Sequence, residues 1–347
     1  RAAAHVHTPG WETFDPSMTI DPSMTTPPLA ITMGDASGVG PEILLRAFAS
    51  GELGTDVVAV GDLAVLDLCN RRLHCDVTLQ PLTAPRPATP GVLGVLDEAA
   101  LSAQALRIGE IDRASGAAAL AYVARATRLA LAGDAAAVVT LPINKAATRL
   151  SAPTFTGHTE YVAELCGRTS STLMLASERA IVTHVSTHVS LREAIALAQP
   201  ARILEVIIQT DEILRRLRPT RRIAVAGLNP HAGEGRAFGD EDDICIAPAI
   251  AQARAQGLEV SGPHPPDTVF LDMVQGRVDA VVCMYHDQGH IPMKLLDFRG
   301  GVNVTLGLPI VRTSVDHGTA FDIAWKGVAF TDSLRDACAM ARRLSRR

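Results

Sequence analysis

Short apolar runs alternate with longer amphipathic stretches along most of the chain. The runs are rich in Val, Ile and Ala and end at Gly, Pro, His or Tyr; they cover residues 29–33, 57–60, 136–141, 181–183, 223–226 and 280–284. Because successive positions are apolar, rather than every second one, the runs predict strands buried on both faces of a mainly parallel sheet.

Between these runs lie Ala- and Leu-rich stretches with helical periodicity. They predict helices over residues 41–49, 115–132, 201–216, 247–256 and 333–343. A repeated order of strand, polar turn and helix is typical of the α/β class. The segment 80–95, which contains several prolines and threonines, interrupts this order and is expected to be a surface excursion.

The unusual polar residues gather where the predicted strands end. These places are residues 34–40, 142–145, 188, 229–231 and 286–289. In open parallel sheets, ligands bind outside the carboxyl ends of the strands. The pattern therefore predicts a ligand site built from these strand ends.

Composition excludes several classes of protein. The 347 residues give room for one large or two modest domains, and 47% apolar with 20% charged residues excludes a wholly disordered chain. A net charge of -5 argues against a protein that coats nucleic acid or an anionic membrane. No apolar run approaches the roughly 18 residues that span a bilayer.

Two features bear on compartment and on the start of the fold. The six cysteines contain no C-x-x-C pair and lie mostly in apolar surroundings, which predicts reduced thiols in a cytoplasmic protein. Residues 1–28 are rich in Pro, Thr and Ser and lack the apolar core of a signal peptide. We expect them to be a disordered or expression-derived tail outside the fold.

Lysine is rare, since the 32 basic residues include only Lys145, Lys294 and Lys326. In a chain that otherwise uses arginine, a retained lysine can mark a position that needs a compact ammonium group. A coding bias explains the same count without any function. The sequence leaves both interpretations open.

Three histidines lie just past predicted strands in similar polar surroundings. Converging imidazoles would suit Zn²⁺, Co²⁺ or Ni²⁺ and leave positions open for substrate oxygens; the three are His188, His231 and His286. No local spacing such as H-E-x-x-H supports a metal site, so ordinary loop histidines remain the alternative. Further candidates are His184, His290 and His317.

The turn at 34–42 joins a predicted strand to a predicted helix and can present backbone N–H groups to an anion. A tight turn without a ligand is the alternative. Its glycine spacing departs from G-x-G-x-x-G, and no segment matches a Walker loop. A Rossmann dinucleotide fingerprint is therefore absent.

One C-terminal segment carries Lys294, Asn303 and Arg312. Arg312 is predicted to follow an apolar strand, and its planar guanidinium suits a phosphate or a carboxylate. The lysine would add a point charge and the asparagine a neutral donor. Together they predict a pocket for a small, highly anionic substrate, with Asp287 and Asp316 as candidates either to orient a histidine or to cap turns.

Seven motifs occur in a characteristic order. They are Met-Gly-Asp-x-x-Gly-Val-Gly-Pro-Glu at 33–42, Ser-Gly at 115–116, Val-Val-Thr-Leu-Pro-Ile-Asn-Lys at 138–145, Thr-Gly-His-Thr-Glu at 156–160, Leu-Asn-Pro-His-Ala-Gly-Glu at 228–234, Tyr-His-Asp-Gln-Gly at 285–289 and Arg-Thr-Ser-Val-Asp-His-Gly-Thr-Ala at 312–320. Over nearly all of residues 29–343 the chain resembles the 4-hydroxythreonine-4-phosphate dehydrogenase family of pyridoxal phosphate biosynthesis.

The resemblance implies two sets of site residues. The divalent metal (Zn, Co, Mg, Ni or Mn) would be held by His188, His231 and His286. The small phosphorylated hydroxy-acid substrate would be bound by His158, Thr159, Lys294, Asn303 and Arg312.

The resemblance also implies an isocitrate/isopropylmalate-dehydrogenase-like fold of two α/β lobes. Residues 29–150 plus 290–347 would form the first lobe and 151–289 the second, with the active site in the cleft between them. NAD or NADP would bind without a Rossmann motif. The family further implies a homodimer whose subunits share active sites.

The reaction that the resemblance implies is oxidation of the 3-hydroxyl of 4-hydroxythreonine 4-phosphate, followed by decarboxylation to 3-amino-2-oxopropyl phosphate. Lys294 and Asp287 are the candidates for proton transfer. The sequence departs from the family at Ala36, where proline is usual, and at His290-Ile-Pro-Met-Lys294, where Leu-Pro-x-x-Lys is usual. The second departure looks more like the branch that oxidises D-threonate or D-erythronate 4-phosphate to dihydroxyacetone phosphate.

Other functions remain as alternatives to this interpretation. A related branch of the family acts on cis-dihydrodiols of aromatic acids. A metal-dependent hydrolase or lyase on the same scaffold would need no nicotinamide. A sugar-phosphate-binding sensor is disfavoured, because the sequence has neither a basic patch nor a DNA-binding element.

Overall fold

The computed structural model describes residues 26–297 and 300–346. Its strands are β1 (Leu29–Thr32), β2 (Val57–Gly61), β3 (Thr78–Leu82), β4 (Val92–Asp97), β5 (Ala137–Thr140), β6 (Thr172–Ala176), β7 (Ile181–His184), β8 (Ile223–Ala226), β9 (Val260–His264), β10 (Ala280–Cys283), β11 (Val302–Leu306) and β12 (Arg312–Val315). Within the described ranges they form one sheet in the order β3-β4-β2-β1-β5-β12-β11-β6-β7-β10-β8-β9.

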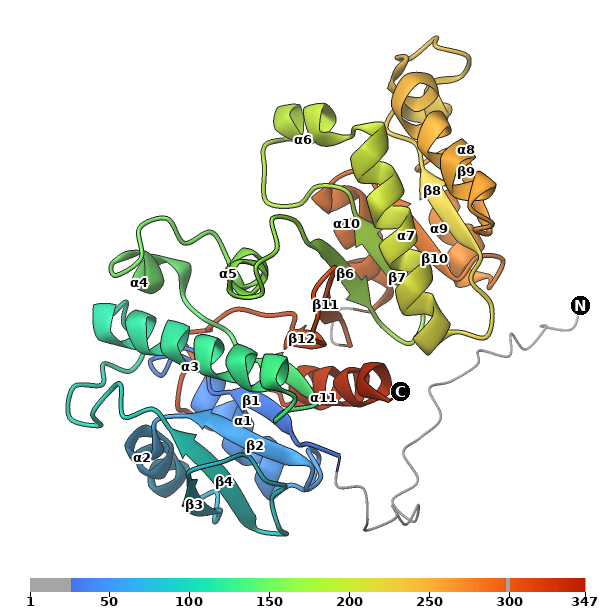
Figure 1. The fold of residues 1–347 in the computed structure, drawn as a ribbon. Helices are drawn as coiled ribbons and strands as arrows, with labels where there is room; N and C mark the ends of the chain where they lie inside the picture. The colour runs from blue at the N-terminus through green and yellow to red at the C-terminus, as the bar shows by residue number, and fades with distance from the viewer. Residues whose placement is uncertain (1–25, 298–299, 347) are drawn as a thin grey trace, which may run out of the picture.

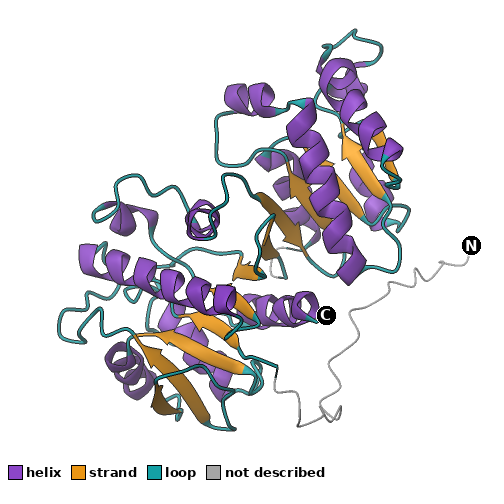
Figure 2. Cartoon of the chain, in the orientation of Figure 1, coloured by secondary structure: helices purple, strands orange, loops and turns teal. Residues whose placement is uncertain are grey.

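Helices cover both faces of this sheet (Figures 1 and 2). They are α1 (Gly40–Ala49), α2 (Leu63–Leu73), α3 (Arg113–Ala132), α4 (Lys145–Arg149), α5 (His158–Leu165), α6 (Leu191–Leu197), α7 (Pro200–Leu217), α8 (Ala247–Ala255), α9 (Val269–Val274), α10 (His286–Leu296) and α11 (Asp332–Ser345), with short helical turns η1 (Pro230–Gly233) and η2 (Asp242–Ile246). The α/β class is confirmed.

The central strands confirm the sequence pattern. Every residue of β1, β2, β5, β7, β8 and β10 is buried, as continuous apolar runs require when helices cover both faces. The five predicted helices are also present, as α1, α3, α7, α8 and α11. The apolar core therefore forms where the sequence pattern places it.

The prediction of a surface excursion at 80–95 holds for the loop between residues 82 and 92 and is wrong at both ends of the segment. The end of β3 and the start of β4 lie inside this segment, and Leu93 and Val95 are fully buried. Pro81 stands in β3, the edge strand, where a missing backbone N–H leaves no ladder hydrogen bond unmade. The other prolines of the segment, Pro85, Pro87 and Pro90, lie in the largely exposed loop between β3 and β4.

Arg312 also differs from its prediction. It does not follow a strand but is the first residue of β12, which pairs with β5 and β11 in the middle of the sheet. Its long side chain lies 2% exposed in the interior. A sequence window gives no sign that a guanidinium is buried there.

The strands of the two halves of the sheet run in opposite directions. β11 is antiparallel to both of its neighbours, β12 and β6, and β6 is antiparallel to β7. The other eight pairings among the described strands are parallel. The strand ends that carry His188 and Arg312 therefore belong to oppositely directed parts of one sheet.

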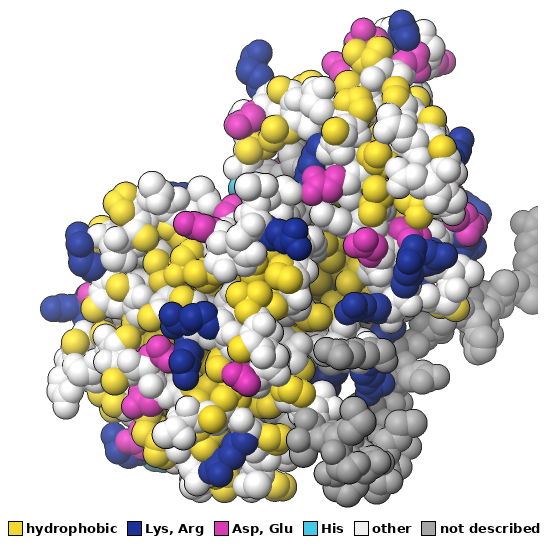
Figure 3. Space-filling view, in the orientation of Figure 1, with side chains coloured by type: hydrophobic (Ala, Val, Ile, Leu, Met, Phe, Trp, Pro, Cys, Tyr) yellow, Lys and Arg dark blue, Asp and Glu magenta, His cyan; other side chains and the backbone are white. Residues whose placement is uncertain are grey.

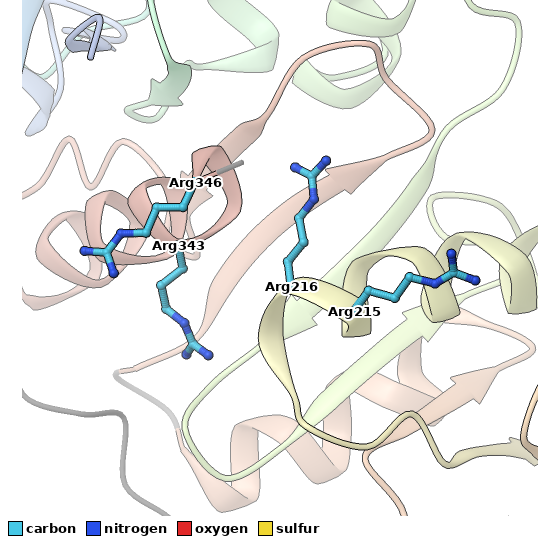
Figure 4. A pocket seen from close by; sticks show the side chains of 4 residues that line it. All are labelled: Arg215, Arg216, Arg343 and Arg346. Carbon is cyan, nitrogen blue, oxygen red and sulfur yellow. The ribbon is translucent and has the colours of Figure 1, made fainter. Parts of the chain in front are cut away.

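Figure 1 shows two lobes joined through the middle strands. Helices α7 and α11 come from different lobes and are tied end to end: Arg216 Nη1 donates to Leu344 O at 2.6 Å and Arg343 Nη2 donates to Leu217 O at 2.9 Å. Beside this junction is a cavity of about 400 Å³ lined by Arg215, Arg216, Arg343 and Arg346 (Figure 4). These contacts hold the lobes together at the ends of both helices.

The exact division of the chain into lobes stays a prediction. The proposed boundary between residues 289 and 290 falls inside α10, which packs on β7 and β10 of the second lobe. Residues 290–296 therefore lie beside the second lobe although they precede the return of the chain to β11 and β12.

On the face shown in Figure 3, Lys and Arg side chains are interspersed with Asp and Glu, and apolar side chains fill the region between the lobes. None of the helices in residues 26–297 and 300–346 is long and apolar enough to cross a membrane. All six cysteines are free thiols.

Candidate active site

Arg312 is a buried cation without an acidic partner. Its Nη1 donates to Thr305 Oγ1 at 3.0 Å and its Nη2 to Thr140 Oγ1 at 2.5 Å, while its Nε has no hydrogen-bond partner. It makes no ion pair with any carboxylate of the described chain. Burial lowers the pKa of Arg312 to about 10, which still leaves it charged at neutral pH. A charge held in this way is poised for an anionic ligand.

His158 adds a second unsatisfied group near the same place. It is the first residue of α5, and its Nε2 is buried without a hydrogen-bond partner. Burial, reinforced by the positive charge of Arg312, lowers the pKa of His158 well below its usual value, so the ring is neutral. Thr159 follows it on the first turn of α5. A neutral imidazole beside a cation can donate to or accept from a polar ligand.

Lys294 lies in a separate polar cluster. Its ammonium group forms an ion pair with the carboxylate of Asp316, and Asn303 Nδ2 donates to Asp316 Oδ1 at 3.1 Å. The other amide atom, Asn303 Oδ1, is buried without a partner. The structure therefore brings Lys294 and Asn303 together through Asp316, which is one of the two aspartates singled out from the sequence.

Imidazoles gather around the start of α10. The rings of His286 and His290 are stacked with centroids 3.6 Å apart, and the ring centroids of His286 and His188 are 5.8 Å apart. His290 Nδ1 lies 3.2 Å from His184 Nε2. A Cβ atom on Gly289 would approach that same nitrogen to 2.5 Å, so glycine is required for His184 to reach this position.

Local hydrogen bonds explain why the Tyr-His-Asp-Gln-Gly motif adopts this turn. The buried Gln288 side chain accepts from Met284 N at 2.6 Å and donates to Gly227 O at 2.7 Å, which ties the end of β10 to the end of β8.

Burial lowers the pKa of His184 to about 3 and that of His290 to about 4. Both rings are thus neutral at physiological pH.

His231 lies apart from this cluster. It belongs to η1, after β8, and its ring packs against Phe238 with centroids 6.0 Å apart. The turn that holds it is fixed by Asp242, which accepts from the backbone N–H groups of Leu228 and Asn229 at 2.9 and 3.1 Å. Across residues 26–297 and 300–346, no three His, Cys, Asp or Glu side chains are close enough together to hold a metal ion.

Two carboxylates lie beside the predicted metal ligands. Glu160 Oε1 is 3.8 Å from His188 Nδ1, and this contact is the main reason why the pKa of Glu160 is lowered. Asp287 accepts from His286 Nδ1 at 2.6 Å, and its side chain is 68% exposed. The geometry of Asp287 suits the orienting role better than that of a buried base. The sequence gave Glu160 no role, although Glu160 is the last residue of the Thr-Gly-His-Thr-Glu motif at 156–160.

Comparison with known proteins identifies the family of this site. The model of the family described as "Pyridoxal phosphate biosynthetic protein PdxA" matches residues 53–341. The chain belongs to the PdxA family. A D-threonate 4-phosphate dehydrogenase of Salmonella typhimurium is 45% identical to it over 322 residues, covering 91% of this chain and 98% of the relative.

Two further PdxA-family relatives give the same result. A 4-hydroxythreonine-4-phosphate dehydrogenase of Desulforapulum autotrophicum is 43% identical over 323 residues, covering 91% of this chain and 94% of the relative. The crystal structure of 4-hydroxythreonine-4-phosphate dehydrogenase from Klebsiella pneumoniae superposes with a TM-score of 0.85 at 45% identity, covering 92% of this chain and 98% of that one. The expected family and its fold are confirmed, and with them a dehydrogenase.

Proposed function

We propose that this PdxA-family chain oxidises the 3-hydroxyl of a four-carbon hydroxy acid 4-phosphate with NAD or NADP, and that the product then loses CO₂. The observation that carries the proposal is the buried Arg312, whose Nε has no hydrogen-bond partner and whose positive charge acts on the buried His158, where Nε2 is also unpartnered. Two buried polar groups without partners would destabilise a protein that binds no ligand, whereas an anionic, polar substrate would provide their missing hydrogen bonds. The cytoplasm, where the phosphorylated substrate and the nicotinamide are available, is the proposed setting.

Two substrates fit this chemistry and differ at carbon 2. D-threonate 4-phosphate carries a hydroxyl there, whereas 4-hydroxythreonine 4-phosphate carries an amino group. We favour D-threonate 4-phosphate because His290 replaces the usual leucine beside Lys294, and because a relative named for that substrate is 45% identical. 4-Hydroxythreonine 4-phosphate, with its place in pyridoxine biosynthesis, is the alternative that the family name supports.

The chemistry of the donor set fits a divalent metal. His188, His286 and His231 follow β7, β10 and β8, which are neighbours in the sheet, and the first two rings already lie near each other. Neutral imidazole nitrogens suit Zn²⁺, Co²⁺ or Ni²⁺. When bound, such an ion would act as a Lewis acid that lowers the pKa of the substrate hydroxyl, while the nicotinamide accepts a hydride.

The side chains of this enzyme would hold and orient the substrate. Arg312 and His158 would bind one anionic end, and Lys294, positioned by Asp316 and Asn303, would contact the other. Lys294 is also our candidate for moving a proton, since an ammonium group in a partly buried ion pair can transfer one to or from the substrate. Asp287 would hold the ring of His286 in a fixed orientation.

A substrate panel tests this proposal. Purified protein is incubated with D-threonate 4-phosphate, D-erythronate 4-phosphate or 4-hydroxythreonine 4-phosphate, each with NAD⁺ and with NADP⁺, and reduced nicotinamide and CO₂ are measured together. Equal amounts of both products with at least one substrate would support oxidative decarboxylation. Turnover of a phosphorylated substrate without reduced nicotinamide would indicate a hydrolase or lyase instead.

We also propose a homodimer that shares active sites. The segment after His188 exposes an apolar patch, formed by Val189, Leu191, Ile195 and Leu197, of which Leu191 is 59% exposed. Exposed apolar side chains next to an incomplete set of metal ligands favour a second copy of the chain as the covering partner.

Subunit mixing tests this arrangement. We expect His188→Ala and His231→Ala variants to be inactive alone and to regain activity when mixed, if each site takes these residues from different subunits. A monomeric protein in solution, or mixed variants that stay inactive, would contradict shared sites.

A further inference from the structure

We propose that Lys145 is a further substrate-binding residue, which contacts the phosphate group together with Arg312 and His158. The inference deepens the proposed function and rests on it for the phosphorylated nature of the ligand. Neither the sequence motifs nor the resemblance gave Lys145 a role beyond its place in Pro-Ile-Asn-Lys.

The fold places Lys145 near His158, whose ring also feels the charge of Arg312. Lys145 is the first residue of α4, five residues after the last residue of β5, and Asn144 caps the helix by accepting from Ala147 N at 3.0 Å. Thr140, the last residue of β5, accepts a hydrogen bond from Arg312 Nη2. The end of one strand thus carries both the lysine and a hydroxyl that holds the buried guanidinium.

Helix α5 brings the third component to the same place. A Cβ atom on Gly157, which precedes α5, would lie 3.8 Å from Lys145 Cε, so the lysine side chain runs alongside the start of that helix. His158 feels the positive charges of both Arg312 and Lys145. Three elements therefore bring two cations and a neutral imidazole to the N-terminus of an eight-residue helix.

The charge of the phosphate group requires a second positive side chain in addition to Arg312. A phosphate monoester carries about two negative charges at neutral pH. Lys294 is matched by Asp316, so Arg312 alone would leave the phosphate half compensated. Lys145 supplies the second positive charge on the side where Arg312 and His158 present unpartnered nitrogens.

Lys145 is available for this contact. It is exposed, and its ammonium group makes no hydrogen bond or ion pair with the residues that the structure describes. The carboxylate of Glu160 interacts chiefly with His188, which is the main reason why the pKa of Glu160 is lowered, and the positive charge of Lys145 lowers that pKa further. By contrast, Lys326 donates to the backbone carbonyl of Asp322 at 2.6 Å on the surface, which makes it a matched control.

The test compares Lys145→Met, Lys145→Arg and Lys326→Met by calorimetric titration with two probes, inorganic phosphate and unphosphorylated D-threonate. Loss of one charge-assisted contact should weaken phosphate binding by about 10- to 100-fold in Lys145→Met. Lys145→Arg should recover part of this loss, while Lys326→Met should bind as the unchanged protein does. Binding of D-threonate should be the same in all four proteins.

Three results would overturn the inference. They are unchanged phosphate binding in Lys145→Met, an equal loss in Lys326→Met, and a loss confined to D-threonate, which would assign the lysine to the carboxylate. Circular dichroism of each variant checks folding, which an exposed first-turn position should leave intact. Because the titrations need no turnover, a protein that binds phosphate through Lys145 but never reduces nicotinamide would refute the proposed function and leave this inference standing.

Discussion

Replacing Arg312 by methionine should leave the ligand-free protein as stable as before, or more stable, while removing substrate binding. Burial lowers the pKa of this guanidinium to about 10, roughly 2.5 below the usual value. At ~1.4 kcal/mol for each pKa unit, holding the charge in the fold costs about 3 kcal/mol. At 2% exposure, solvent screening does little to reduce this cost.

Removing the buried charge stabilises the fold, but the loss of the hydrogen bonds of Arg312 offsets part of this stabilisation. The substitution removes the bonds to Thr305 and Thr140, each worth about 1 kcal/mol net. Methionine has a similar length and fills the same space with apolar atoms. The free energy of unfolding without ligand should therefore rise by about 0–2 kcal/mol. The penalty is present at every pH below about 10, because the group is charged there in both states, so measurements at pH 7 include it.

Ligand binding should respond in the opposite direction. Truncating one partner of a buried charged contact costs about 2–5 kcal/mol, so affinity for D-threonate 4-phosphate should fall by about 30-fold or more. Urea unfolding without ligand and calorimetric titration with ligand measure the two effects separately. Arg215→Met is the control, since Arg215 is 60% exposed, pairs with Asp211 on the same helix and lies away from the site.

The reasoning would be refuted if Arg312→Met lost more than about 3 kcal/mol of unfolding free energy without ligand. Arg312 would then stabilise the fold itself, and its burial would not indicate a binding site for an anion. Retained affinity for the phosphorylated substrate would refute the binding role directly.

Three further substitutions test other parts of the molecule. His231→Ala should lose bound divalent metal and activity together, measured by elemental analysis and nicotinamide reduction; full activity after exhaustive chelation would exclude the metal. Lys294→Arg should lower kcat/KM by about tenfold or more, because a planar guanidinium cannot replace an ammonium group held by Asp316. Normal turnover by this variant would show that the protein does not need a lysine at this position, and that the small number of lysines in the chain has no functional meaning here. Burial raises the pKa of Asp35 to about 6, so the folded state keeps this proton at pH values where the unfolded chain has lost it. Stability should fall by up to about 3 kcal/mol between about pH 4 and pH 6, and Asp35→Asn should flatten this dependence in chemical denaturation; an unchanged profile would contradict it.

Local sequence patterns predicted the strands that are buried on both faces and the helices between them. They failed at β3, an edge strand that contains Pro81, and at β4, which follows a loop rich in proline, and they did not give the antiparallel strands β6, β11 and β12. Two of their pairings join strands far apart in the chain, because β12 pairs with β5 and β11 pairs with β6. A window of sequence contains no information on such pairing.

The site residues divide in the same way. The sequence pattern placed His188, His286 and Arg312 near strand ends, where polar groups in an α/β protein serve a ligand. The motifs gave no reason to separate His231 from the other two histidines, nor to pair Lys294 with Asp316. Those relations depend on how the loops after the strands fold in space, which a local motif does not specify.

The sequence by itself determined the α/β class, the family and the residue types from which the site is built, because periodicity and motif order are properties of the local chain. Tertiary structure alone decided which charges are compensated. Arg312 is left without a carboxylate in the interior, Lys294 has one, and Lys145 lies exposed beside the first, although all three are simple cations in the sequence. The cost of burying a charge depends on what surrounds it in space, and that is fixed only when distant strands meet.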